Sequence, residues 1–108
     1  MGVLNLEKAF DFVAARDDVE NGKPDPEIYQ LVVDELGVRP AQCLVVEDSP
    51  TGVRAALAAD MAVMAVSTPF TRNSLHASKL LPETRIVDKS DRVIAVAAEI
   101  IRQSQAHR

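Results

Sequence analysis

The stretch Cys43-Leu44-Val45-Val46-Glu47-Asp48-Ser49-Pro50 decides the fold, because an apolar run ends there on two carboxylates and a helix start. Four consecutive apolar residues, 43–46, are typical of a parallel strand that is covered on both faces. Ser49 can cap a helix and Pro50 suits its first position, which predicts a helix to about Ala59. A strand followed directly by a helix is the repeating unit of an α/β fold.

The same unit recurs on both sides of this stretch. Apolar runs predict further strands at Phe10–Ala15, Met61–Val66 and Ile86–Val87. Capping and stop signals predict three further helices: from Asp25 and Pro26 to Gly37, from Thr71 to about Lys79, and from Ser90 or Asp91 to a frayed end after Gln103. Alternation of this kind predicts one α/β domain over residues 1–108, with a parallel sheet and right-handed crossovers.

Residue type and spacing also predict burial. Helical spacing predicts an apolar face on the first and on the last of these helices, formed by Ile28, Leu31, Val32 and Leu36, and by Ile94, Ala97, Ala98 and Ile101. Packing positions are expected for Phe10, Phe12, Tyr29 and Phe70, and for Cys43 as a small buried hydrophobe. Solvated positions are expected for Arg54, Arg72, His76 and His107.

Composition excludes several classes of protein. The chain has 108 residues, a formal net charge of −4 and no cluster of Lys and Arg, which argues against nucleic-acid binding. A single cysteine, Cys43, excludes an internal disulfide and favours a cytoplasmic protein. No apolar stretch approaches the roughly 20 residues of a membrane span, and the N-terminal sequence is unlike a signal peptide.

Two carboxylates and a lysine are the main candidates for chemistry. Glu47 and Asp48 follow a predicted strand at the sheet edge where open parallel sheets bind ligands. Adjacent carboxylates repel one another unless a cation joins them, and Mg²⁺ takes one or two carboxylates together with water or phosphate oxygens. Asp48 and Ser49 could equally be plain helix caps. Lys23 lies between Gly22 and two prolines, which suits a fixed positive charge near a phosphoryl group.

Two segments carry a family resemblance. GKPDPEIY at Gly22–Tyr29 and CLVVEDSPTGVRAA at Cys43–Ala56 resemble the third and fourth motifs of the haloacid dehalogenase superfamily, and more narrowly its phosphatase and β-phosphoglucomutase-like branch. The resemblance extends from about Phe10 to Phe70 and implies a Rossmann-like sheet of three to four strands with flanking helices. It implies action on a small phosphorylated metabolite. It also implies a catalytic lysine, an acidic pair that binds Mg²⁺ and a supporting serine, namely Lys23, Glu47, Asp48 and Ser49.

The nucleophile of that family is missing from this sequence. In the family, one aspartate of a D-x-D motif attacks phosphorus and the other is the general acid and base, but no two aspartates here are separated by one residue. The resemblance therefore implies the C-terminal part of a phosphohydrolase or phosphomutase, a half-domain without the first two core strands and the cap domain. We expect this chain to be inactive alone, to bind Mg²⁺ weakly or not at all, and to be part of a longer protein.

Loss of central strands would leave unpaired sheet edges, which favour association. Three outcomes are open: the Phe10–Ala15 strand moves beside the Cys43–Val46 strand, two chains pair their edges as a homodimer, or the rest of a longer protein completes the sheet. The resemblance also puts Asp60 where the family commonly has glycine at a helix end, at a cost of up to about 1 kcal/mol.

Two other functions stay open. A non-catalytic remnant or interaction module would keep half of the fold and lose the chemistry. A receiver domain of a signalling pathway would share the acidic stretch Leu44–Pro50, with Asp88 as its only candidate phosphate acceptor. The receiver interpretation leaves the lysine segment Gly22–Glu27 unexplained.

Overall fold

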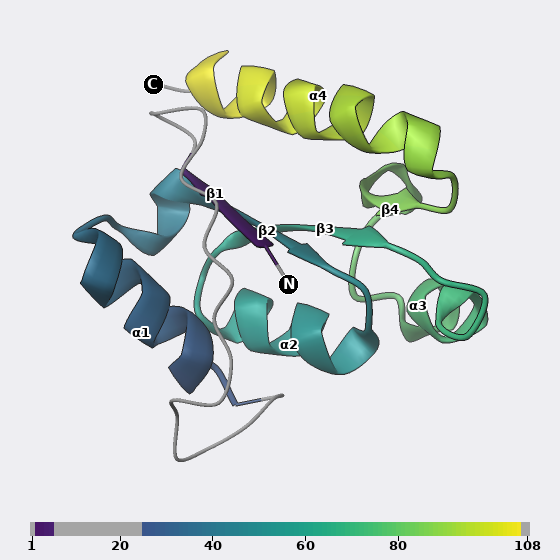
Figure 1. Ribbon diagram of the computed structural model, residues 1–108, viewed down its shortest axis with the longest axis horizontal. Helices are drawn as coiled ribbons and strands as arrows, with labels where there is room; N and C mark the ends of the chain where they lie inside the picture. The colour runs from purple at the N-terminus through teal and green to yellow at the C-terminus, as the bar shows by residue number, and fades with distance from the viewer. Residues whose placement is uncertain (1, 6–24, 107–108) are drawn as a thin grey trace.

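A four-stranded sheet forms the middle layer of the chain (Figure 1). The computed structural model describes residues 2–5 and 25–106. The strands follow one another across the sheet in chain order: β1 (Gly2–Asn5), β2 (Cys43–Glu47), β3 (Ala62–Val66) and β4 (Ile86–Val87). β2, β3 and β4 are parallel, as the sequence predicts.

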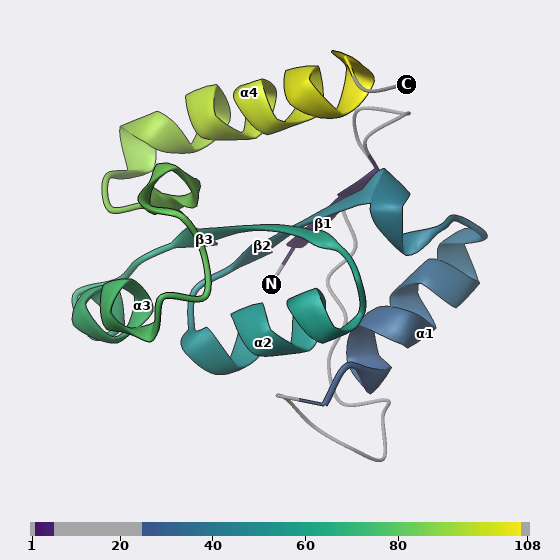
Figure 2. The same cartoon turned by 180° about the vertical axis from the view of Figure 1, so that it is seen from behind.

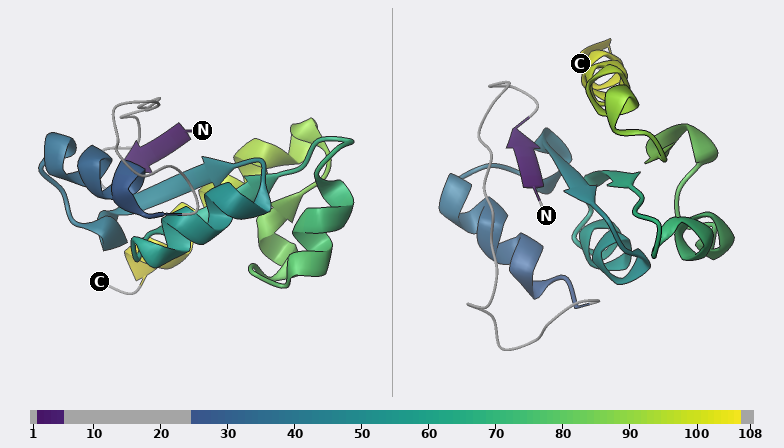
Figure 3. Two further views of the ribbon diagram at one scale, coloured as in Figure 1. Left: turned by 90° about the horizontal axis from the view of Figure 1, so that it is seen from below. Right: turned by 45° about the vertical axis from the view of Figure 1, so that its right-hand side comes forward.

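Helices cover both faces of this sheet. α1 (Glu27–Leu36) and α2 (Pro50–Ala58) lie on one face with α3 (Arg72–Ser78) beside them, and α4 (Val93–Ala106) lies on the other (Figures 2 and 3). Three 3₁₀ turns complete the connections: η1 (Pro40–Gln42), η2 (Glu83–Arg85) and η3 (Ser90–Arg92). The arrangement is the predicted Rossmann-like half-domain with flanking helices. Within the described residues, no helix has the length and apolar character to cross a membrane.

Local signals explain where the helices begin and end. The Asp25 carboxylate accepts a 3.0 Å hydrogen bond from the Glu27 N–H, so it caps α1 even though Pro26 occupies the N-cap position. Gly37 ends α1 with a φ of 66°, a backbone conformation that glycine adopts without strain. Ser49 caps α2 by accepting a 3.3 Å bond from the Gly52 N–H. Asp60 follows α2 with a φ of 62°, a left-handed conformation that glycine adopts more readily than aspartate.

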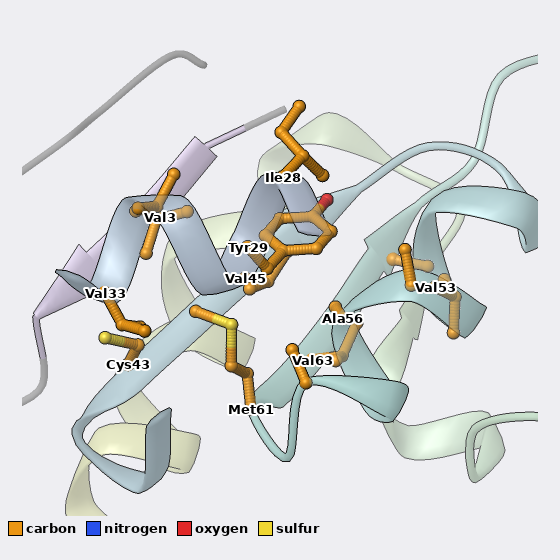
Figure 4. Close-up of a cluster of buried hydrophobic side chains, with 14 of the residues drawn as sticks. Val3, Ile28, Tyr29, Val33, Cys43, Val45, Val53, Ala56, Met61 and Val63 are labelled. Carbon is orange, nitrogen blue, oxygen red and sulfur yellow. The ribbon is translucent and has the colours of Figure 1, made fainter. Parts of the chain in front are cut away.

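Two apolar cores lie on opposite faces of the sheet. Successive strand residues face opposite sides, so Cys43 and Val45 face α1 and α2 while Leu44 belongs to the α4 side. The larger core includes Tyr29, which is fully buried, and Cys43, which is fully buried as predicted (Figure 4). The smaller core joins Leu44, Met64, Val87 and Ile100.

The apolar faces differ in part from the prediction. On α1, Tyr29 and Val33 are buried, whereas Leu31 is only partly buried. On α4 half of the predicted stripe was wrong: Ile94 is 83% exposed and Ala98 is exposed, whereas Ala97 and Ile101 pack against the smaller core as predicted. The side that faces the sheet is formed by Val93, Val96, Ala97, Ile100 and Ile101. Both sets have helical spacing, so packing against the sheet decides which residues face inward. α4 also continues to Ala106, past the predicted fraying point.

The connection from β3 to α3 overturns a second prediction. Phe70 was expected to pack but is 96% exposed. The Thr68 N–H donates a 2.9 Å bond to the Thr71 hydroxyl, and the Phe70 N–H donates a 3.2 Å bond to the Thr68 hydroxyl. These bonds fix a turn that carries Phe70 away from the core. Thr71 occupies the predicted N-cap position, but its side chain makes no capping bond to α3.

β1 was not predicted, and it takes the place beside β2. Gly2 pairs with Val46 and Asn5 with Cys43, in antiparallel register. Val3 is fully buried within the larger core. The Phe10–Ala15 strand, whose shift beside β2 was one of the three outcomes left open by the sequence, falls outside the described residues. An antiparallel strand therefore occupies this side of β2 in an otherwise parallel sheet.

Candidate functional site

The carboxyl end of β2 places the two predicted metal ligands in different environments. Glu47 ends the strand and is only 2% exposed, whereas Asp48 is exposed. Glu47 continues the alternation of Cys43 and Val45, so its side chain lies on the α1 and α2 face. Of the pair, one carboxylate is held inside the protein and the other is open to solvent.

Glu47 is held by hydrogen bonds from two sides. The Tyr29 hydroxyl donates to Oε2, and the backbone N–H of Asp48 donates to Oε1 at 3.3 Å. A buried carboxylate requires such donors, because removal from water is costly when they are missing. Burial, followed by the hydrogen bond and charge of Glu47, raises the pKa of Tyr29 well above its usual value. The phenol therefore keeps its proton and remains a donor.

The first turn of α2 is shaped around this carboxylate. A Cβ atom at Gly52 would overlap the carboxylate of Glu47, so only glycine leaves the space that the side chain occupies. The Ser49 hydroxyl accepts from the Gly52 N–H and lies 3.2 Å from the Thr51 hydroxyl. Ser49 is thus a helix cap beside the acidic pair. The positive end of the α2 dipole favours negative charge at this place.

The donor chemistry fits a hard divalent cation. Glu47 and Asp48 offer carboxylate oxygens, and Mg²⁺ typically uses one or two carboxylates and completes its shell with water or phosphate. Within residues 2–5 and 25–106 there is no group of three or more His, Cys, Asp or Glu side chains suited to a metal ion. Lys23, the predicted charge partner, falls outside those residues, so the structure does not place it.

A second polar cluster, which the sequence did not predict, joins the ends of β3 and β4. Ser67 follows β3 and donates a 2.6 Å bond to the carboxylate of Asp88, which follows β4. His76 of α3 places Nε2 2.9 Å from Asp88 Oδ2 and its Nδ1 against the carboxylate of Glu83. Arg72 donates a 3.2 Å bond to the Asp88 carbonyl. One sequence signal could have revealed this cluster: Ser67 and Asp88 each come directly after a predicted strand.

The expectation that His76 is simply solvated was therefore wrong, whereas Arg72 is exposed as expected. The His76 side chain is 29% exposed and has a carboxylate at each ring nitrogen. The hydrogen bond to Asp88, and then that to Glu83, raises the pKa of His76. The hydrogen bond from Ser67 is the main cause that lowers the pKa of Asp88. These contacts connect α3 to η2 and to the turn after β4.

Comparison with known proteins adds a family assignment. Residues 2–60, more than half of the chain, match the family of haloacid dehalogenase-like hydrolases. A phosphorylated carbohydrates phosphatase of Thermotoga maritima is 55% identical over 56 residues, which are 52% of this chain and 26% of the relative. Fructose-1-phosphate phosphatase YqaB of Escherichia coli is 45% identical over 58 residues, 54% of this chain and 31% of the relative.

A solved structure shows the same fold. CbbY of Rhodobacter sphaeroides, crystallised in complex with phosphate, is 34% identical with a TM-score of 0.61, over 77% of this chain and 35% of that protein. The chain thus spans about a quarter to a third of the length of the relatives named here.

Proposed function

Since the chain belongs to the haloacid dehalogenase-like hydrolases, we propose that it carries the magnesium-binding and charge-stabilising part of a phosphohydrolase for small phosphorylated sugars. The observation that supports this most is the acidic pair at the end of β2, with Glu47 buried in a shaped site and Asp48 exposed beside it. The similar proteins include a phosphorylated carbohydrates phosphatase and a fructose-1-phosphate phosphatase, which supports a phosphorylated sugar as the substrate. A cytoplasmic location is part of the proposal.

Each residue of the site has a distinct role in this proposal. Glu47 and Asp48 hold Mg²⁺, which when bound stabilises negative charge on a phosphoryl group. Lys23 adds a positive charge to the same group. Ser49 fixes the start of α2, so that the backbone of Asp48 keeps its orientation. None of these residues attacks phosphorus, and the sequence contains no D-x-D motif. We therefore propose that the chain alone has little or no turnover.

Calorimetric titration with Mg²⁺ tests the cation site. We expect weak binding by the chain, its loss in Asp48→Asn, and its retention in Glu99→Gln, a control that removes a carboxylate on α4. Micromolar affinity, or equal binding by all three proteins, would count against the proposal. Hydrolysis of para-nitrophenyl phosphate should stay at the buffer rate. Magnesium-dependent turnover that disappears in Asp48→Asn would overturn the expected inactivity.

A further inference from the structure

Tyr29 connects the two segments of the proposed site through one hydrogen bond. It lies in α1, which begins at the end of the lysine segment Gly22–Glu27, and its hydroxyl donates to Glu47 at the end of β2. Tyr29 is fully buried and Glu47 is 2% exposed. It is also the only tyrosine of a chain without tryptophan.

The contacts around Glu47 define the orientation of its carboxylate. Tyr29 donates to one oxygen and the backbone of Asp48 to the other, while Gly52 leaves the space in which the group lies. Loss of either donor would remove a contact that orients the carboxylate within its cavity. Carboxylates that bind metals are commonly held in this way, and loss of the supporting donor typically lowers metal affinity about 10–100-fold.

We propose that Tyr29 is a positioning residue for the cation site, which holds the Glu47 carboxylate in the orientation in which it meets a divalent cation beside Asp48. This inference rests on the proposed function. It adds that α1, and not only the end of β2, determines the affinity of the site. The ring of Tyr29 packs in the larger core, so the hydroxyl is the part that acts on Glu47.

Tyr29→Phe isolates this role, because the ring stays and only the hydroxyl is removed. Mg²⁺ binding is measured by calorimetry well below the unfolding temperature for the chain, Tyr29→Phe, Glu47→Gln and Glu99→Gln. We expect about 10-fold weaker binding in Tyr29→Phe, loss of binding in Glu47→Gln and no change in Glu99→Gln. Thermal unfolding without Mg²⁺ shows separately how far the hydroxyl contributes to folding.

The emission of Tyr29 gives a second readout that a purely structural role would not produce. Because the chain has no tryptophan, its tyrosine fluorescence comes from the phenol next to Glu47. A change in this fluorescence when Mg²⁺ is added reports on that phenol. We expect Mg²⁺ to change the emission of the chain and of Glu99→Gln, but not that of Glu47→Gln. This measurement stays decisive even where Tyr29→Phe is too unstable for calorimetry.

The outcomes separate this inference from the proposed function. Weaker binding in Tyr29→Phe together with an emission change that requires Glu47 supports the positioning role. Binding that requires Glu47, with unchanged affinity in Tyr29→Phe or with no response of the Tyr29 emission, overturns the positioning role and leaves the cation site intact. Binding that is missing in the chain, or independent of Glu47, overturns both.

Discussion

Among single residues, Gly52 is the one whose replacement most directly tests the environment of the Glu47 side chain. In an exposed helix, alanine is better than glycine by about 1 kcal/mol. Here the added Cβ would overlap the Glu47 carboxylate, and a forced shift in a packed core costs roughly 1–3 kcal/mol. We expect Gly52→Ala to unfold at a lower temperature than the unmodified chain, measured by circular dichroism.

Arg54→Ala provides the control for this variant, because Arg54 lies on the exposed side of the same helix. Its effect should stay within about 0.5 kcal/mol. A Gly52→Ala protein that unfolds at or above the original midpoint would show that the Glu47 carboxylate does not fill this space.

The chemistry at the end of β2 could be predicted from sequence only to a point. The apolar run placed Glu47 and Asp48 at a strand end, and Ser49 was correctly assigned as a helix start. The run has apolar residues for both faces, so it does not show which carboxylate points inward. That depends on Tyr29 and Gly52, which approach from α1 and α2. A tertiary contact of this kind leaves no local pattern.

Between helices and strands, the cluster around His76 predicts a pH-dependent contact. A carboxylate faces each ring nitrogen of His76, from Asp88 after β4 and from Glu83 in η2. Both nitrogens must carry protons to donate to both groups, which requires the charged ring. Arg72 is the other charged group near Asp88. The cluster therefore holds α3 against η2 and β4 when His76 is protonated.

Stability should fall as this proton is lost. The pKa of His76 is raised in the folded chain, chiefly by Asp88, so the folded state binds more protons above about pH 6.5. The contribution is complete below that pH and disappears as the pH rises through the folded pKa. We expect the thermal midpoint of the chain to fall more between about pH 6 and pH 9 than that of His76→Gln. The difference in midpoint between the two proteins should be modest, because the groups are near solvent. Midpoints that change with pH in parallel would exclude this contribution of His76 to stability.

Element boundaries were the best predicted part of the fold, and the phase of α4 the worst. Gly37, Ser49 and Pro50 are local signals with a direct backbone cause, and they lie where the helices end or begin. α4 is apolar on several sides, so spacing alone allows more than one buried stripe. The structure buries Ile100 and exposes Ile94, because packing on the sheet, not helix propensity, selects the side.

For the chain as a whole, the main question is what pairs with the side of β2 where the family resemblance implies further strands. The sequence left three outcomes open: a shifted Phe10–Ala15 strand, pairing between two chains, or completion of the sheet by the rest of a longer protein. The structure shows β1 in antiparallel pairing at this side. β1 has only four residues and no clear alternation of polar and apolar residues, so its sequence does not predict a strand. Its strand conformation is recognised only from its pairing with the edge of β2.

Val3 is the side chain that anchors β1 to the rest of the chain. It pairs with Val45 of β2 and is fully buried in the larger core. In Val3→Asp a carboxylate replaces that contact, and the loss of a buried valine alone costs about 1.5–3 kcal/mol. We expect β1 to detach, the β2 edge to become available, and the chain to associate into dimers or larger species. Size-exclusion chromatography with light scattering at several concentrations measures this association.

Ile94→Asp is the matched control, because it places the same charge at an apolar position that is 83% exposed. This variant should keep both the mass and the unfolding midpoint of the unmodified chain. Equal mass and equal midpoints for Val3→Asp and Ile94→Asp would mean that β1 does not protect β2. A larger mass for Val3→Asp alone would show that β1 suppresses edge pairing. The homodimer, one of the outcomes left open by the sequence, would then form only when β1 is displaced.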